Sequence, residues 1–84
     1  MMTMHFAYIL KSLKDGTYYK GSCSKPVEER LAEHNRGKER YTKAKRPWVV
    51  HYTESFKTRS EARKREAFFK SPKGWGWLKD NNII

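Results

Sequence analysis

The sequence predicts an α+β fold in which a three-stranded antiparallel sheet is flanked by helices. Three runs rich in aromatic and β-branched residues, at 5–11, 17–22 and 48–56, are typical of strands. Two other stretches, 26–36 and 59–70, combine helix-start signals with helical spacing of their apolar residues. Because 84 residues with 37% hydrophobic content can bury only one thin core, we expect a single domain over 1–84.

The first two strands are expected to form a hairpin, because Asp15-Gly16 between them is a strong turn signal. Tyr8 and Tyr19 would then lie on neighbouring strands, in a register that the sequence leaves open. Lys20 would face solvent or a ligand. Alternation in the first strand places Phe6, Tyr8 and Leu10 on one face and Ala7 and Ile9 on the other.

The first helix is expected over Pro26 to Arg36, with Ser24 as a candidate N-cap. Arg30 and His34 are four residues apart and so lie on the same side of this helix. A guanidinium and an imidazole pointing together toward the glycine-bearing end of the second strand indicate an active site. The structural alternative is a surface arginine with a packed stem beside an ordinary helix-end histidine.

Residues 36–47 are rich in Lys and Arg and predict a mobile basic loop. The loop either is solvated or contacts phosphates, through Lys43, Lys45 and Arg46, with Tyr41 available to stack on a base. In the 59–70 helix, which begins at a capping box, Glu66 falls on the stripe that should be buried. A buried carboxylate must be paired or bind a metal, and Lys70 and Arg30 are the candidate ion-pair partners. On the outer surface of this helix we expect Arg59, Arg63 and Lys64. Further along the chain we expect a core closed by Trp75, Trp77 and Leu78, followed by a frayed tail at 81–84.

The charge balance favours a polyanionic partner. Nineteen Lys and Arg against nine Asp and Glu give a net charge of +10, which suits nucleic acid better than an acidic membrane surface. The single cysteine, Cys23, excludes an internal disulfide and a zinc site of several thiolates. With no signal peptide or membrane span in the sequence, we expect a cytoplasmic protein.

Four short motifs, in this order and spacing, resemble the GIY-YIG nuclease superfamily, in the small bacterial form similar to the N-terminal domain of the GIY-YIG subunit of excinuclease ABC. They are Phe6-Ala7-Tyr8-Ile9-Leu10, Tyr19-Lys20-Gly21-Ser22, Arg30-x3-His34 and Glu66-x3-Lys70. Ser22 stands where the excinuclease has a lysine. For the asparagine that supports the site in several members, Asn81 and Asn82 are candidates by proximity alone.

The resemblance implies a divalent-metal-dependent endonuclease acting on DNA, or on RNA, in repair or processing. Tyr8 would orient or deprotonate the attacking water, Arg30 would bind the scissile phosphate, and Glu66 would hold one Mg²⁺ or Mn²⁺. Tyr19 would bond a phosphate or Tyr8, and His34 would poise Tyr8 or the water. The substrate-binding residues are expected to be Lys20, Gly21, Ser22, Lys43, Lys45, Arg46 and Lys70. Specificity would be low or supplied by a protein partner, and the alternative is a non-catalytic nucleic-acid-binding module.

Overall fold

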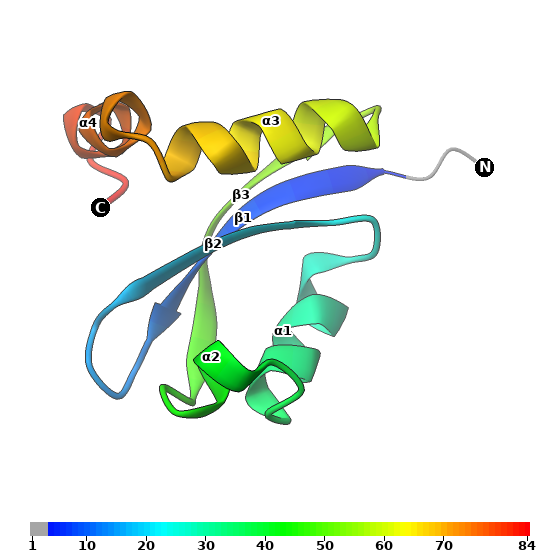
Figure 1. The fold of residues 1–84 in the computed structure, drawn as a ribbon, viewed down its shortest axis with the longest axis vertical. Helices are drawn as coiled ribbons and strands as arrows, with labels where there is room; N and C mark the ends of the chain where they lie inside the picture. The colour runs from blue at the N-terminus through cyan, green and yellow to red at the C-terminus, as the bar shows by residue number, and fades with distance from the viewer. Residues whose placement is uncertain (1–3) are drawn as a thin grey trace.

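The sheet has three antiparallel strands, as the sequence predicts, and their order is β2-β1-β3 (Figure 1). The computed structural model describes residues 4–84. The strands are β1 (His5–Ser12), β2 (Tyr18–Cys23) and β3 (Trp48–Phe56). In the hairpin, Tyr8 pairs with Gly21 and Leu10 pairs with Tyr19. β1 is therefore central, and β2 is an edge strand whose outer side is free to face a ligand.

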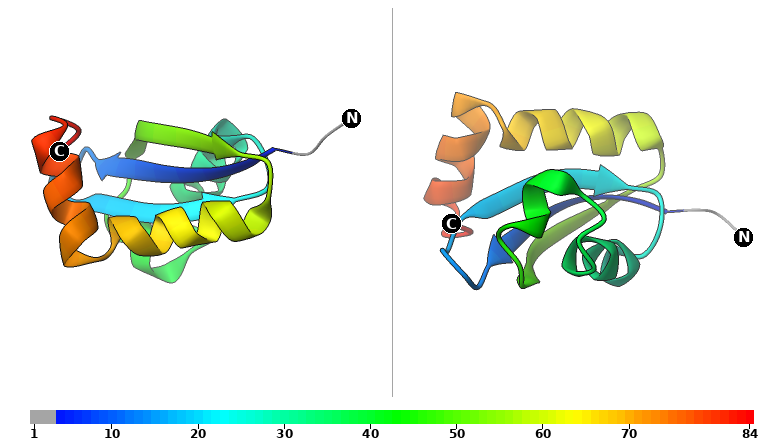
Figure 2. Two further views of the ribbon diagram at one scale, coloured as in Figure 1. Left: turned by 90° about the horizontal axis from the view of Figure 1, so that it is seen from above. Right: turned by 60° about the horizontal axis from the view of Figure 1, so that its bottom comes forward.

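Helices cover both faces of the sheet. They are α1 (Val27–Asn35), the short α2 (Arg40–Lys43), α3 (Arg59–Phe69) and α4 (Pro72–Asp80). α1 and α2 lie below the sheet in Figure 1 and α3 lies above it, while α4 turns across the end of the sheet (Figure 2). No helix within residues 4–84 is long and apolar enough to cross a membrane.

The alternation of β1 divides the core into two clusters, one on each face of the sheet. Ala7 and Ile9 pack with Phe69 and Leu78 on the α3 side, and Tyr8 and Leu10 pack with Val27 and Trp48 on the α1 side. Because both faces of the central strand are covered, all four of its alternating side chains are 0–1% exposed. The division of β1 into two apolar sets is thus confirmed.

The two main helices begin differently from one another. At α3 the expected cap is confirmed, because Thr58 Oγ1 accepts a hydrogen bond from the Glu61 amide. The expectation for α1 is wrong: its N-cap is Pro26, which has no side-chain acceptor. Ser24 instead hydrogen-bonds the His5 ring through its hydroxyl, at 2.8 Å from Nδ1. This contact ties the turn after β2 to the start of β1.

Three peripheral parts of the chain differ from the expectation. The basic loop and the C-terminal tail are more ordered than expected, and Trp75 is less buried. The expected basic loop contains α2, whose Thr42 is 0% exposed. The tail expected to fray folds back instead, and Ile83 and Ile84 pack against the cluster around Leu78. Trp75 does not close the core, since it is 39% exposed. Hydrophobic burial therefore reaches further along the chain ends than helical spacing alone predicts.

Candidate active site

The edge strand β2 divides the candidate site into two halves. Side chains alternate along a strand, so Tyr19 and Gly21 lie toward α1, and Lys20 and Ser22 lie toward α3. The tyrosine, arginine and histidine of the motifs lie in the α1 half, and the glutamate lies in the α3 half. Figure 1 shows β2 running between these two groups of helices. A strand of nucleic acid lying along β2 would contact both.

A chain of buried hydrogen bonds connects Tyr8 to α2. The Tyr8 hydroxyl lies 3.1 Å from His34 Nε2, and His34 Nδ1 lies 2.8 Å from Thr42 Oγ1. Thr42 Oγ1 in turn donates to a backbone carbonyl, that of Glu39, at 3.4 Å. All three side chains are 0–1% exposed. The helical spacing of α1 brings the imidazole under the sheet, and the fold of α2 supplies the far end of the chain.

This chain assigns the tautomer of His34. The acceptor within reach of the Tyr8 hydroxyl is the imidazole Nε2, and the Arg30 guanidinium beside it can only donate, so the phenol donates and Nε2 accepts. A neutral imidazole then carries its proton on Nδ1 and donates it to Thr42 Oγ1. Burial lowers the pKa of His34, with the Arg30 charge acting the same way, so this ring is neutral at pH 7. Its Nε2 lone pair is therefore available to accept the hydrogen bond from the phenol.

Tyr8 itself is held as a neutral phenol. Burial raises its pKa above the usual value of 10.0, and the Arg30 guanidinium beside it only partly offsets this effect. A phenol with a raised pKa is a poor base unless a neighbouring group accepts its own hydroxyl proton. His34 Nε2 is the group in position to do so. Since Tyr8 is 1% exposed, an attacking water can reach its hydroxyl only after neighbouring side chains move aside.

Gly21 is required by the close approach of Tyr8. A Cβ atom at this position would lie 2.6 Å from the Tyr8 hydroxyl oxygen and 3.2 Å from the Tyr19 ring. Real Cβ atoms essentially never come within 3.0 Å of another heavy atom, so any larger residue would displace the phenol. The glycine of the second motif therefore shapes the site.

Arg30 is held on both sides by carboxylates of its own chain. Its two terminal amino groups each donate at 2.8 Å, one to Glu33 and one to Glu39. Glu33 also pairs with Lys25, and these hydrogen bonds lower the pKa of its carboxyl to about 2. The Glu39 side chain is 44% exposed and that of Glu33 only 10%. A phosphate competing for Arg30 would therefore displace Glu39 first.

Glu66 is less buried than its position on the helix stripe suggests, with 25% of its side chain exposed. Its two oxygens accept hydrogen bonds from Ser22 Oγ at 2.5 Å and from Lys70 Nζ at 2.7 Å. Of the two expected ion-pair partners, Lys70 is the one found, because Arg30 lies across β2 with its own carboxylates. The expected ion pair with Lys70 is thus confirmed, whereas the expected burial of Glu66 is wrong, because the carboxylate is partly exposed at the edge of the sheet.

The donor set around Glu66 fits one weakly held divalent ion. Within residues 4–84 no group of three or more His, Cys, Asp or Glu side chains could enclose a metal. Mg²⁺ keeps most of its waters and is commonly held by one or two carboxylates together with substrate phosphate. The Glu66 carboxylate and the Ser22 hydroxyl are oxygen ligands of that kind. Lys70, with 53% of its side chain exposed, can move away from Glu66 into solvent.

Tyr19 electrostatically connects the two halves. Its ring centroid lies 4.9 Å from that of His34 and 6.4 Å from that of Tyr8. Burial raises the pKa of Tyr19, and charges from both sides of β2 act on it, Glu39 and Arg30 from one side and Lys70 and Glu66 from the other. Tyr19 therefore lies within the electrostatic influence of charged groups from both halves.

The remaining expected substrate contacts are partly occupied by other interactions. Lys20 lies over the Trp75 ring, 4.3 Å from its centroid, and burial lowers its pKa. Lys45 pairs with Asp15 at 3.2 Å. Arg46 donates to the backbone carbonyls of Lys43 and Asn35. Asn81 donates to the Trp77 carbonyl at the end of α4, which is a helix-terminal role.

Three contributors to the site were missed by reasoning from the sequence, and one of them is Glu33, which pairs with Arg30 from the same helix. Thr42 and Glu39 lie in the stretch predicted as a mobile loop, and they contact His34 and Arg30. A weak signal is present, because a Thr three residues after a Glu is compatible with a short helical turn. Only the packing of α2 under Tyr19 and Trp48 makes this turn part of the site.

The chain matches a known family over most of its length. Residues 4–76 match the model of the GIY-YIG catalytic domain. The chain therefore belongs to the GIY-YIG family, whose function at family level is that of a nuclease.

Within that family, the chain is similar to a group of small proteins called UPF0213. It is 47% identical over 66 residues to a UPF0213 protein of Staphylococcus saprophyticus, covering 77% of this chain and 78% of that one. A UPF0213 protein of Listeria welshimeri is 51% identical over 67 residues, 79% of this chain and 72% of the relative. The solution NMR structure of a UPF0213 protein from Bacillus halodurans matches with a TM-score of 0.52 and 31% identity, over 92% of this chain and 83% of that one. The predicted family and fold class are both confirmed.

Proposed function

We propose that this chain is a divalent-metal-dependent endonuclease that hydrolyses DNA phosphodiester bonds with low intrinsic sequence specificity, in DNA repair or processing. The family supplies the reaction class, and a net charge of +10 supplies the attraction to a polyanion. Specificity beyond this would come from a protein partner. RNA is a substrate of the same chemistry and belongs in the test.

The observation that carries the proposal is the buried hydrogen-bond chain through Tyr8, His34 and Thr42. Buried polar groups do not stabilise a small core better than apolar ones of the same shape. A neutral imidazole bonded to a phenol, beside a guanidinium, is instead what a proton transfer near a phosphate requires. Tyr8 would take a proton from water as it passes its own to His34 Nε2, and Arg30 would bind the non-bridging phosphate oxygens.

Glu66 and Ser22 are the residues that would hold Mg²⁺ or Mn²⁺. Such an ion would neutralise charge on the phosphate and stabilise the leaving oxygen. Lys70, released from its contact with Glu66, would add a positive charge for the substrate backbone. Tyr19 would hydrogen-bond a phosphate or the Tyr8 hydroxyl.

The second candidate is a binding module that holds nucleic acid without cutting it. One observation favours it: Arg30 and Glu66 are both fully paired within the chain, so neither is free for chemistry until a partner is displaced. An inactive site would keep such pairs permanently. The two candidates differ in whether the purified protein cuts.

The test is cleavage of nicked, flap, branched and single-stranded DNA, and of single-stranded RNA, by the purified protein with Mg²⁺ or Mn²⁺. Glu66→Gln keeps the shape of the side chain and removes its charge, so we expect it to abolish cutting. Glu28→Gln, at an exposed position on α1, is the matched control and should cut like wild type. Cutting by Glu66→Gln, or by wild type in excess chelator, contradicts the proposed metal role. Tight binding without any cutting favours the binding module.

A further inference from the structure

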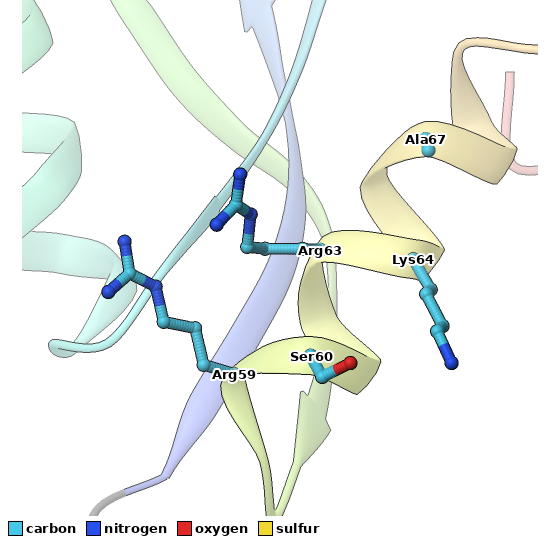
Figure 3. A pocket seen from close by; sticks show the side chains of 5 residues that line it. All are labelled: Arg59, Ser60, Arg63, Lys64 and Ala67. Carbon is cyan, nitrogen blue, oxygen red and sulfur yellow. The ribbon is translucent and has the colours of Figure 1, made fainter.

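Two arginines of α3, Arg59 and Arg63, are exposed as expected, and their side chains extend toward the edge strand. Arg59 and Arg63 extend from the helix toward β2 and the turn that follows it, whereas Lys64 points away (Figure 3). The four-residue spacing places the two guanidiniums one above the other along the helix. α3 therefore presents a pair of cations beside the candidate site.

The two arginines line a cleft of about 260 Å³ between α3 and the end of β2. Its other lining residues are Ser22, Cys23, Ser24 and Ala62. These residues contribute hydroxyl groups, a thiol and a small apolar side chain to the lining, and none of the lining residues is a carboxylate. Within residues 4–84, neither Arg59 nor Arg63 makes an ion pair, whereas Arg30 and Arg65 both do. The positive charge in the cleft is therefore not compensated by the protein.

The cleft adjoins the Glu66 carboxylate. Ser22 lines the cleft and also donates a hydrogen bond to Glu66 at 2.5 Å, so the cleft and the Glu66 carboxylate have Ser22 in common. Along α3, Arg63 precedes Glu66 by three residues and Arg59 precedes it by seven. At a rise of about 1.5 Å per residue these separations are about 4.5 and 10.5 Å. Phosphates on one strand of a duplex follow each other at about 3.4 Å along the axis. The stretch of α3 from Arg59 to Glu66 therefore corresponds to about three nucleotides.

We propose that the cleft between α3 and the end of β2 binds backbone phosphate of the substrate strand, within about three nucleotides of the cleaved bond and on one side of it only. Guanidinium groups suit this role because their planar donors match two phosphate oxygens at once. The cleft would fix the direction in which the strand runs past Glu66. This inference rests on the proposed function for the position of the cut, but binding of phosphate in the cleft does not depend on cutting.

The binding test uses a labelled 20-nucleotide single strand without divalent metal, and compares Arg59→Gln/Arg63→Gln with Lys64→Gln. Each phosphate contact with single-stranded DNA contributes about 0.7 to the slope of log K against log salt, so losing two should flatten the slope by about 1.4. Lys64→Gln, on the same helix but pointing away, should change it little. Equal slopes for the double variant and Lys64→Gln, with melting curves matching wild type, would overturn the proposal.

The position test uses cleavable strands in which one phosphate at a time is a neutral methylphosphonate. For wild type, neutral phosphates on one side of the cut should slow cleavage, and for Arg59→Gln/Arg63→Gln the same substitutions should have no further effect. Symmetric interference, or interference that persists in the double variant, would overturn the assigned side. If wild type cuts nothing yet the double variant flattens the salt slope, the cleft stands and the nuclease proposal fails. If wild type binds no strand, both fail.

Discussion

Replacing Thr42 by valine tests the buried hydrogen-bond chain directly. Valine has nearly the same shape but no hydroxyl, so His34 Nδ1 loses the acceptor that lies 2.8 Å away. Both side chains are 0% exposed, and no water can take the place of the hydroxyl without a rearrangement. Either Nδ1–H stays unpaired, or the ring changes tautomer and the Tyr8 hydroxyl loses its acceptor. One buried polar group is unsatisfied in both cases.

An unsatisfied buried donor costs about 1 to 3 kcal/mol. In a domain of 60 to 100 residues, each kcal/mol lowers the melting temperature by about 4 to 8 °C, so Thr42→Val should melt about 4 to 24 °C below wild type. Thr42→Ser keeps the hydroxyl and should recover most of this loss. A purely apolar role for the Thr42 methyl would give the reverse order, with valine the more stable.

The assay combines thermal melting followed by circular dichroism with nitrogen NMR of the His34 ring. In wild type we expect a neutral ring with its proton on Nδ1, and in Thr42→Val a changed tautomer or a mixture. If Thr42→Val melts like wild type and its His34 ring keeps the Nδ1 proton, the hydrogen bond to Thr42 does not set the tautomer of His34. The role given to His34 as proton acceptor for Tyr8 would then lose its structural support.

Three other changes probe neighbouring parts of the site. Gly21→Ala puts a Cβ 2.6 Å from the Tyr8 hydroxyl, so it should lower both stability and cutting; cutting at the wild-type rate would show that Tyr8 does not need this position. Arg30→Lys keeps the charge and loses the planar donors, so single-turnover cutting should fall by about 10²–10³ while affinity changes little; equal losses of stability and cutting would indicate a structural arginine. Acidification should destabilise the fold in two steps, seen as falling denaturant midpoints. The unfolded state gains a proton near pH 6.5 that His34, with its lowered pKa, does not accept in the fold. The Glu33 contribution, present above pH 4.5, is lost toward its folded pKa of about 2. Glu33→Gln is the control and should lose less stability than wild type below pH 4.5, where Glu39 and Asp15, with their lowered pKa values, still contribute.

Local chemistry accounts for the parts of the fold that the sequence predicted well. The third strand was expected at the residues where β3 begins and ends, because Pro47 precedes it and the run itself is β-branched and aromatic. The α3 cap depends on contacts within four residues, between Thr58 and Glu61. The Arg30 and His34 pairing on one helix side follows from helical geometry. Each of these features depends on neighbours in sequence, which a pattern can record.

The missed features depend on contacts between distant segments. Ser24 is a good N-cap by residue type, yet the turn after β2 brings it to His5, nineteen residues away in sequence. Glu66 lies on the apolar stripe of α3, yet at the edge of the sheet that stripe reaches solvent and Ser22. Spacing along a helix indicates which side a residue takes. It does not indicate where the facing sheet ends.

The family, the fold class and the motif residues of the site follow from the sequence, since the four motifs and their order are linear properties of the chain. The partners of those residues depend on packing. It joins His34 of α1 to Thr42 of α2, brings Glu39 to Arg30, and directs Arg59 and Arg63 toward β2. The physical reason is that hydrogen bonds and ion pairs act over a few ångströms, and which groups come that close is decided by packing of distant segments.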